Sequence, residues 1–119
     1  MSPDGKAGCL FCKIIDKQIP GRIAYEDDSA LAFHDLNPMA PLHLLIIPKR
    51  HIASLADMTE ADAIIIGHLH WIATVLARQQ KIDQTGFRTV INSGSGAGQT
   101  VFHLHLHLLG GRPFQWPPG

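Results

Sequence analysis

Three histidines recur at every second position near the C-terminal end of the chain, at His103, His105 and His107, with leucines between them. On a β-strand, successive side chains point to opposite faces of the sheet. The three imidazoles would therefore share one face, and the leucines would share the other, in the core. The alternative is a strand whose polar face is only exposed to solvent, but three imidazoles are unusual on such a face. The row predicts a functional site.

Two kinds of chemistry suit such a row, metal binding and nucleophilic attack. Alternate residues of a straight strand are about 6.6 Å apart, so the outer two lie about 13 Å apart. Because zinc–nitrogen bonds are only about 2.0–2.1 Å long, one metal cannot take all three side chains. A neutral imidazole is a good nucleophile and is largely neutral at pH 7. Its attack on phosphorus would give a phospho- or nucleotidyl-histidine, so the row must be divided between roles.

The segment before the histidines, residues 92–100, is rich in glycine and serine. Glycines let backbone N–H groups approach a phosphate closely. Asn92, Gln99 and Thr100 could add side-chain donors. A flexible connection between strands is the alternative reading of such a stretch. Beside the histidine row, the segment favours phosphorus chemistry.

The two cysteines form a C-x-x-C at Cys9 and Cys12. Such a pair is a frequent half-site for tetrahedral zinc and needs two more ligands, which no second C-x-x-C supplies. The alternative is two reduced thiols. A thioredoxin-like redox motif is disfavoured because no βαβ pattern surrounds the pair.

The elements expected to position these residues are short strands and two helices. We predict a short helix over 10–15 and a long helix from Thr59 to about Gln80, where Thr59 and Asp62 are spaced as in a capping box. The apolar face of the long helix is predicted at Ala61, Ile65, Leu69, Ile72, Ala73 and Leu76. Strands are expected at 23–25, 30–34, 43–47, 87–92 and 101–109. This order predicts an α+β fold with an antiparallel sheet of about five strands.

Composition limits the remaining possibilities. The 119 residues suffice for one domain, predicted over 9–119 after a flexible segment over 1–8. With 10 basic and 10 acidic residues, the chain lacks the basic excess of nucleic-acid-binding proteins. No uninterrupted apolar run approaches the roughly 20 residues of a membrane-spanning helix, and no apolar signal region follows the first residues. We therefore expect a cytoplasmic protein without membrane or nucleic-acid partners.

The run at 103–109 resembles the histidine-triad (HIT) signature, in which three histidines alternate with apolar residues. Four further segments, 33–38, 43–51, 98–102 and 116–119, resemble the Hint branch of this superfamily. The resemblance implies a homodimer that binds purine nucleoside monophosphates. It also implies hydrolysis of nucleoside 5′-phosphoramidates, such as AMP–amine and AMP–lysine compounds, through a nucleotidyl-histidine and without a catalytic cofactor.

The resemblance also implies roles for individual residues. His105 is the nucleophile on the α-phosphorus, and His107 and His43 flank it. The implied catalytic set comprises His105, His107, His43, His103 and Thr100. The implied nucleotide-binding set comprises Asp35 for the ribose, Leu10, Phe11, Ile14, Phe33 and Leu36 for the base, and Asn92, Gly98, Gln99, Thr100, His105 and His107 for the phosphate. Thr100 departs from the pattern, because many Hint proteins have serine there.

Similar proteins also suggest the missing zinc ligands. In many bacterial members of the superfamily, the cysteine pair joins residues that correspond to His51 and His103. The implied site is a closed, structural zinc site formed by Cys9, Cys12, His51 and His103. That division would leave His105 for chemistry.

Three other functions compete with the phosphoramidase. A nucleotide-binding regulatory module with vestigial catalysis would have no need of a free central imidazole. Dinucleoside polyphosphate hydrolysis belongs to another branch, and the ending at 116–119 resembles Hint instead. A zinc-only structural module would leave His105 and His107 unexplained.

Overall fold

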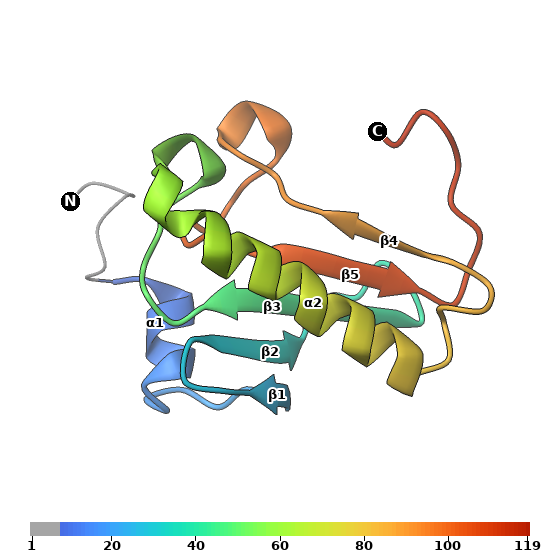
Figure 1. The fold of residues 1–119 in the computed structure, drawn as a ribbon, viewed down its shortest axis with the longest axis horizontal. Coiled ribbons are helices and arrows are strands. Elements are labelled where there is room, and N and C mark those ends of the chain that lie inside the picture. The colour runs from blue at the N-terminus through green and yellow to red at the C-terminus, as the bar shows by residue number, and fades with distance from the viewer. Residues whose placement is uncertain (1–7) are drawn as a thin grey trace.

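The computed structural model describes residues 8–119, so the tail predicted over 1–8 lies almost wholly outside the described residues. Five strands form one antiparallel sheet in the order β1-β2-β3-β5-β4 (Figure 1). The strands are β1 Ile23–Glu26, β2 Ala30–His34, β3 Leu42–Pro48, β4 Phe87–Val90 and β5 Leu106–Gly110. The helices are α1 Leu10–Ile15 and α2 Ala63–Gln79, with short 3₁₀ turns at Leu55–Asp57, Glu60–Asp62 and Ser95–Ala97. The predicted antiparallel architecture is confirmed.

The two faces of the sheet are covered by different helices. In β2 and β3, Ala32, Leu44 and Ile46 belong to the core that packs against α2. Their neighbours Phe33 and Leu45 belong to a second cluster, which includes Phe11 and Ile14 of α1. The alternation of strand side chains produces this division. A histidine within a strand whose side chain points to the same face as Leu45 therefore lies on the α1 face of the sheet.

The start of α2 follows the predicted capping box. The Asp62 carboxylate accepts a hydrogen bond from the Thr59 backbone N–H at 2.8 Å, and a 3₁₀ turn leads into the helix. The predicted apolar face is buried at Leu69, Ile72, Ala73 and Leu76. Ala61 is exposed, contrary to expectation. It lies in the 3₁₀ turn, where three residues per turn shift the helical face.

The apolar character of α2 is stronger than the absence of long apolar runs suggests. Within the segment Glu60–Gln79, a window of 18 residues reaches a mean hydropathy of 1.2, so the segment is long and apolar enough to cross a membrane on those criteria alone. The expectation that no helix reaches this level was wrong, because hydropathy is averaged over a window. Core helices of soluble proteins meet the same criteria, and one face of α2 packs on the sheet.

The end of the sheet near the histidine row differs from the prediction. β5 begins at Leu106 rather than at residue 101, and β4 ends at Val90 rather than at 92. The last pair of the β4–β5 ladder is Val90 with His107. Before this pair the chain turns to another partner, and the Leu104 N–H donates to the Ile52 carbonyl at 2.7 Å. His103 and His105 therefore precede the strand.

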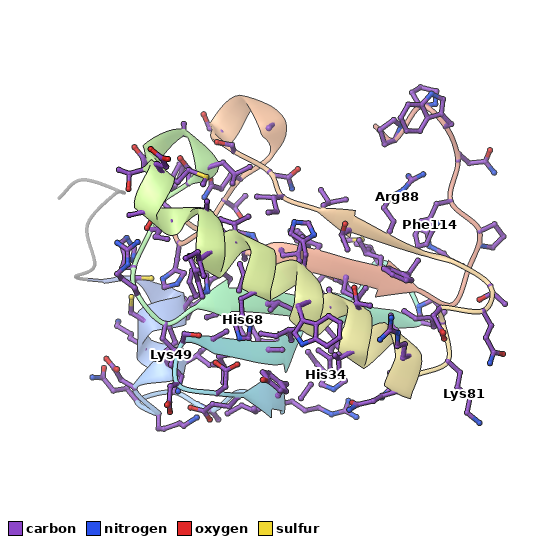
Figure 2. The ribbon with its side chains drawn as sticks, viewed as in Figure 1. His34, Lys49, His68, Lys81, Arg88 and Phe114 are labelled. Carbon is purple, nitrogen blue, oxygen red and sulfur yellow. The ribbon has the colours of Figure 1, made fainter. Side chains whose placement is uncertain are left out.

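After β5, the C-terminal segment returns to the side of β4. Arg88 of β4 donates to the Gln115 carbonyl at 2.9 Å and lies 5.2 Å from the centre of the Phe114 ring (Figure 2). The segment is thus held against the outer strand of the sheet.

A carboxylate joins α2 to the β1–β2 hairpin. Asp27 accepts hydrogen bonds from the Tyr25 hydroxyl at 2.7 Å and from two backbone N–H groups at 2.8 Å. His68, which projects from α2 (Figure 2), places Nε2 2.6 Å from the same carboxylate. Partial burial opposes ionisation of Asp27, but the bonds from His68, Tyr25 and the backbone outweigh it and hold the pKa well below its usual range.

Substitution of Asp27 by alanine should therefore destabilise the fold. We expect a loss of about 2–3 kcal/mol of unfolding free energy, since hydrogen bonds to a charged group are worth about 1.5–3 kcal/mol. Urea denaturation measures this loss. The matched control is Asp28→Ala at the exposed neighbouring position, where we expect a change within about 0.5 kcal/mol. Equal losses in the two variants would contradict this role for Asp27.

Candidate active site and metal centre

The three alternating histidines divide between two sites. The leucines between them, Leu104 and Leu106, are 1% exposed and belong to the α2 core, as predicted. The His105 and His107 side chains line a cavity. The His103 ring lies instead with His51, at a ring-centre distance of 4.9 Å. One outer histidine is thus separated from the other two.

The cavity has a volume of about 280 Å³ and lies between α1 and the sheet. Its apolar lining includes all five residues predicted for the base: Leu10, Phe11, Ile14, Phe33 and Leu36. Its polar lining includes Asp35, Thr100, His105 and His107. Arg22, Asn37 and Val101 also line the cavity and were not predicted. A mostly apolar cavity with a few convergent polar groups is typical of small-molecule sites.

The proton on the central histidine can be placed from its hydrogen bond. The Nδ1 atom of His105 lies 2.7 Å from the backbone carbonyl of His103. A carbonyl only accepts, so Nδ1 carries the proton and Nε2 carries a lone pair. The Phe11 ring stands perpendicular to the His105 ring, at a centre distance of 5.1 Å, and limits its rotation. These contacts hold the His105 ring with its Nε2 lone pair available for nucleophilic attack.

The same reasoning fixes the protons of the flanking histidines. The backbone N–H of Met39 donates to Nδ1 of His43 at 3.0 Å, so the His43 proton is on Nε2. That proton faces Nδ1 of His107 at 2.9 Å, which leaves the His107 proton on Nε2. Met39 was not predicted, because it acts through its backbone and no side-chain pattern marks such a role. These hydrogen bonds leave the Nε2–H group of His107 pointing away from His43.

Asp35 lies beside these hydrogen bonds. Its Oδ1 atom accepts the Asn37 N–H at 2.9 Å, and its Oδ2 atom is 3.4 Å from Nε2 of His43. Asp35, His43 and His107 offer atoms close enough together for a metal ion. The Met39 bond argues against one, because a metal on Nε2 would require His43 to lose both protons. The trio is better suited to holding and moving protons.

Burial lowers the pKa values of all three imidazoles on this face of the sheet. It is the main cause for His43 and His105, and the Asp35 carboxylate opposes it. Burial, together with His105 and His43, lowers the pKa of His107 to about 4. The three rings are therefore neutral at pH 7, as the assigned protons require.

This depressed pKa predicts a pH dependence of stability. The pKa of His107 is about 4 in the folded chain against an ordinary value of 6.5, so the unfolded chain takes up the proton first as pH falls. Stability should decrease between these two values, by up to about 1.4 kcal/mol per pH unit. Urea denaturation at pH 7, 6 and 5 should show a shallower decrease for His107→Gln than for the wild type. Parallel decreases would contradict the prediction.

The glycine-rich loop is ordered by one buried side chain. Gln99 is 3% exposed. Its Oε1 atom accepts the Gly94 N–H at 2.8 Å, and its Nε2 atom donates to the carbonyls of Ala53 and Val101 at 2.8 and 3.0 Å. Gly94 and Gly98 adopt positive φ angles of 89° and 95°, which glycine tolerates.

The loop places the predicted phosphate ligands unequally. Thr100 lines the cavity, whereas Asn92, Gly98 and Gln99 are not among the lining residues. The predicted phosphate contact of Gln99 does not fit, because its amide holds the loop. A flexible connection, the alternative interpretation of this stretch, is also at odds with these bonds.

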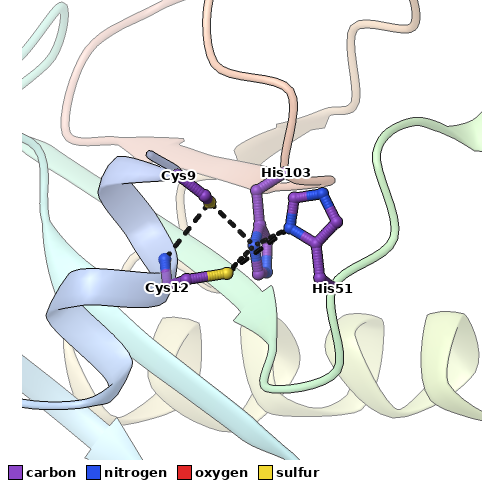
Figure 3. A group of neighbouring side chains, drawn as sticks. All are labelled: Cys9, Cys12, His51 and His103. Carbon is purple, nitrogen blue, oxygen red and sulfur yellow. Dashed lines mark hydrogen bonds between the residues drawn. The ribbon is translucent and has the colours of Figure 1, made fainter. Parts of the chain in front are cut away.

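The second site lies at the start of α1 and gathers the four predicted zinc ligands (Figure 3). Nδ1 of His103 is 3.4 Å from the sulfur atoms of Cys9 and Cys12 and 3.2 Å from Nδ1 of His51. The Cys12 sulfur is also 3.4 Å from Nδ1 of His51. A tetrahedral zinc ion with two sulfur and two nitrogen ligands would separate them by about 3.3–3.8 Å.

The orientation of His103 also suits a metal. Its Nε2 atom lies 2.7 Å from the Pro48 carbonyl and therefore carries the proton, so Nδ1 presents a lone pair to the cysteines. Metal-binding histidines usually donate their other N–H in this way. The four residues thus fit a structural zinc ion in donor type, spacing and orientation.

Comparison with known proteins matches 16–114 of the chain to the model of the HIT domain. An uncharacterized HIT-like protein from Synechocystis is 54% identical over 110 residues, which cover 92% of this chain and 96% of that protein. A HIT family hydrolase from Legionella pneumophila has a TM-score of 0.92 at 48% identity and covers 94% of this chain and 100% of its own. A histidine triad nucleotide-binding protein from Candida albicans has a TM-score of 0.79 at 31% identity, over 92% of this chain and 83% of that one.

Proposed function

Because the chain belongs to the HIT family and is similar to hydrolases of that family, we propose that it hydrolyses purine nucleoside 5′-phosphoramidates to nucleoside monophosphates and amines. The main support is the arrangement of protons at the cavity. A lone pair on Nε2 of His105 and a proton on Nε2 of His107 belong to neighbouring rings, with centres 5.0 Å apart. A nucleophile and a proton donor thus line the same cavity.

In the first step, Nε2 of His105 attacks the α-phosphorus, and the bond between phosphorus and nitrogen breaks. The Nδ1–H group of His105 keeps its hydrogen bond to the His103 carbonyl, which stabilises the positive charge that develops on the ring. The bound phosphoryl anion favours the protonated form of His107. In that form, Nε2–H of His43 can turn to Asp35, 3.4 Å away, while His107 delivers a proton to the leaving nitrogen.

In the second step, the neutral His107 accepts a proton from water, and the hydroxyl group bonds to phosphorus. His105 leaves as a neutral imidazole, and the nucleoside monophosphate is released. The sum of the two steps is one phosphoramidate and one water converted to one nucleotide and one amine. Protein groups carry each step, and we propose that no catalytic cofactor takes part.

The cavity supports a nucleotide as the substrate. Phe11 and Phe33, with rings perpendicular at 5.3 Å between centres, form an apolar wall suited to a flat base. Asp35 would accept hydrogen bonds from the ribose hydroxyls, and Thr100 would donate to the phosphate. Asn92 and Gly98, in the same loop as Thr100, remain proposed phosphate contacts. The Candida albicans relative is itself named as a nucleotide-binding protein.

The test is AMP release from adenosine 5′-phosphoramidate and from an AMP–lysine conjugate, with a diadenosine polyphosphate as the competing substrate. We expect a higher kcat/KM for both phosphoramidates than for the polyphosphate. Faster cleavage of the polyphosphate would favour the other hydrolase class. Tight AMP binding without turnover of any substrate would favour a nucleotide-binding module.

We propose a structural zinc ion at Cys9, Cys12, His51 and His103, on the basis of their spacing and protonation. When bound, zinc would cross-link α1 to the segments that carry the two histidines, and it supplies no reacting group. We also propose a homodimer. β4 is an outer strand of the sheet, and α2 exposes Ile64 and Trp71, with exposed fractions of 86% and 55%. A monomeric mass in light scattering would contradict the dimer.

A further inference from the structure

The cysteine pair is built so that a disulfide could replace the metal. Cys9 is the N-cap of α1 and Cys12 lies in its first turn, where the Cys12 N–H donates to the Cys9 sulfur at 3.3 Å. The two sulfur atoms are among ligand atoms that all lie within 4.8 Å of one another. Residues three apart in a helical turn have Cα atoms about 5 Å apart, within the range of disulfides. Rotation of the side chains would suffice for bond formation.

Access and composition also suit this reaction. Cys9 is partly exposed, whereas Cys12 is buried. Cys9 is thus the less buried of the two thiols and the more accessible to a small oxidant, and Cys12 is placed to resolve the product. These are the only two cysteines in the sequence, so oxidation within one chain has a single possible disulfide.

The cysteine pair contacts the cavity through α1. Leu10 and Phe11, which lie between the two cysteines, and Ile14, which follows them, line the apolar wall. The Phe11 ring also contacts the His103 ring, at 6.0 Å between centres, and the His105 ring at 5.1 Å. A change in the position of α1 would therefore alter both the base wall and the packing of the nucleophile.

A second connection runs through His103. Its ring nitrogen faces the cysteines, and its backbone carbonyl accepts the Nδ1 proton of His105. Loss of the metal would release the His103 ring from α1. Because the His103 carbonyl accepts the hydrogen bond that orients His105, this release would also affect the His105 ring. The metal centre and the nucleotide cavity thus share α1 and His103.

We propose that Cys9 and Cys12 form a reversible thiol–disulfide site, with a peroxide as the oxidant, and that oxidation releases zinc and weakens nucleotide binding. The inference rests on the zinc site and the nucleotide cavity proposed above. The Cys9 thiolate attacks hydrogen peroxide, the O–O bond breaks, and a sulfenic acid and hydroxide form. The Cys12 thiolate then attacks the Cys9 sulfur, the S–S bond forms, and a second hydroxide leaves. The two sulfurs lose two electrons, and the peroxide becomes two waters after protonation.

Zinc leaves because it needs thiolate ligands, which the disulfide no longer supplies. A dithiol such as dithiothreitol reverses the reaction by exchange, and zinc can bind again. Without the cross-link to His51 and His103, α1 holds its wall of the cavity less firmly. Nucleotide affinity therefore falls upon oxidation and recovers upon reduction.

The experiment treats the zinc-loaded full chain with hydrogen peroxide and follows four quantities together: zinc release to a chromophoric chelator, intact mass, free thiols and AMP affinity by calorimetry. We expect loss of two hydrogens in mass and of both thiols, with release of zinc in proportion. We expect the Kd for AMP to rise by about tenfold, a typical size for coupling between sites. Dithiothreitol with zinc should restore the original Kd.

Two controls separate this reaction from general damage. Cys9→Ser replaces the N-cap thiol with a hydroxyl that can still cap the helix, and it cannot form the disulfide, so its mass should not fall by two hydrogens. Oxidation of the three methionines adds oxygen and is distinguished by mass. Peroxide that leaves both thiols intact, or that oxidises Cys9 further without a disulfide, would overturn the proposal. A disulfide with unchanged AMP affinity would overturn the coupling.

The outcomes also separate this inference from the proposals beneath it. If the reduced protein holds no zinc, the zinc proposal fails, and the mass and AMP measurements still decide the disulfide and its coupling. If the reduced protein does not bind AMP, the proposed function fails together with the coupling, while intact mass still decides the disulfide.

Discussion

Replacement of His105 by alanine is expected to lower kcat for phosphoramidate hydrolysis by at least about 10⁴-fold, in line with the removal of nucleophiles in other enzymes. The hydrogen bond from Nδ1 of His105 to the His103 carbonyl leaves a lone pair on Nε2, which is the attacking atom. Alanine offers no atom for covalent attack. AMP affinity should change little, since the base wall of Leu10, Phe11 and Phe33 remains.

The measurement is AMP release under substrate saturation, together with calorimetric binding of AMP. Rapid quenching of the wild type should reveal a nucleotidyl adduct by intact mass, and the variant should show none. His70→Ala, at an exposed position of α2, is the matched control and should retain full activity. An active His105→Ala enzyme, or an adduct mapped to another residue, would exclude the proposed nucleophile.

Replacement of Cys12 by alanine is expected to abolish zinc binding and to lower the melting temperature by about 10–20 °C. Zinc at about 1,000 times its Kd stabilises a folded protein by about 4 kcal/mol, which the variant would lose. Cys12 is 5% exposed beside Phe11, so the change acts at the junction of α1 and the sheet. Metal analysis and calorimetric melting measure the two effects.

A chelator provides the matched comparison for this variant. It should lower the melting temperature of the wild type towards that of Cys12→Ala, and it should leave the variant unchanged. The small remaining difference would come from the lost sulfur atom. If the purified wild type contains no metal and its melting temperature does not respond to added zinc, the structural role assigned to zinc is wrong.

The features that the sequence predicted well depend on local patterns. The capping residues Thr59 and Asp62 lie three positions apart, and their bonds form within a single turn. Leu106 and Leu108 of β5 alternate with the histidines at period two, so their burial follows from strand geometry. Such patterns need no knowledge of distant parts of the chain.

The features that were missed depend on distant or backbone partners. β5 starts late because Leu104 bonds to Ile52, more than fifty positions earlier. Gln99 was predicted to face phosphate, but the Ala53 carbonyl and the loop backbone engage its amide. Met39 sets the His43 proton through a backbone N–H that every residue except proline possesses. Local sequence patterns contain no sign of these bonds.

The sheet separates two kinds of side chain, which has a consequence for how such a protein can change over evolution or in the laboratory. Strand residues that contact α2, such as Leu44, Leu106 and Leu108, are hydrocarbon and do not border the cavity. Their neighbours Leu45 and His107 do border it. Thermal tolerance can therefore be tuned on one side while substrate preference is tuned on the other. A library confined to either side should yield gains in one property with little loss in the other.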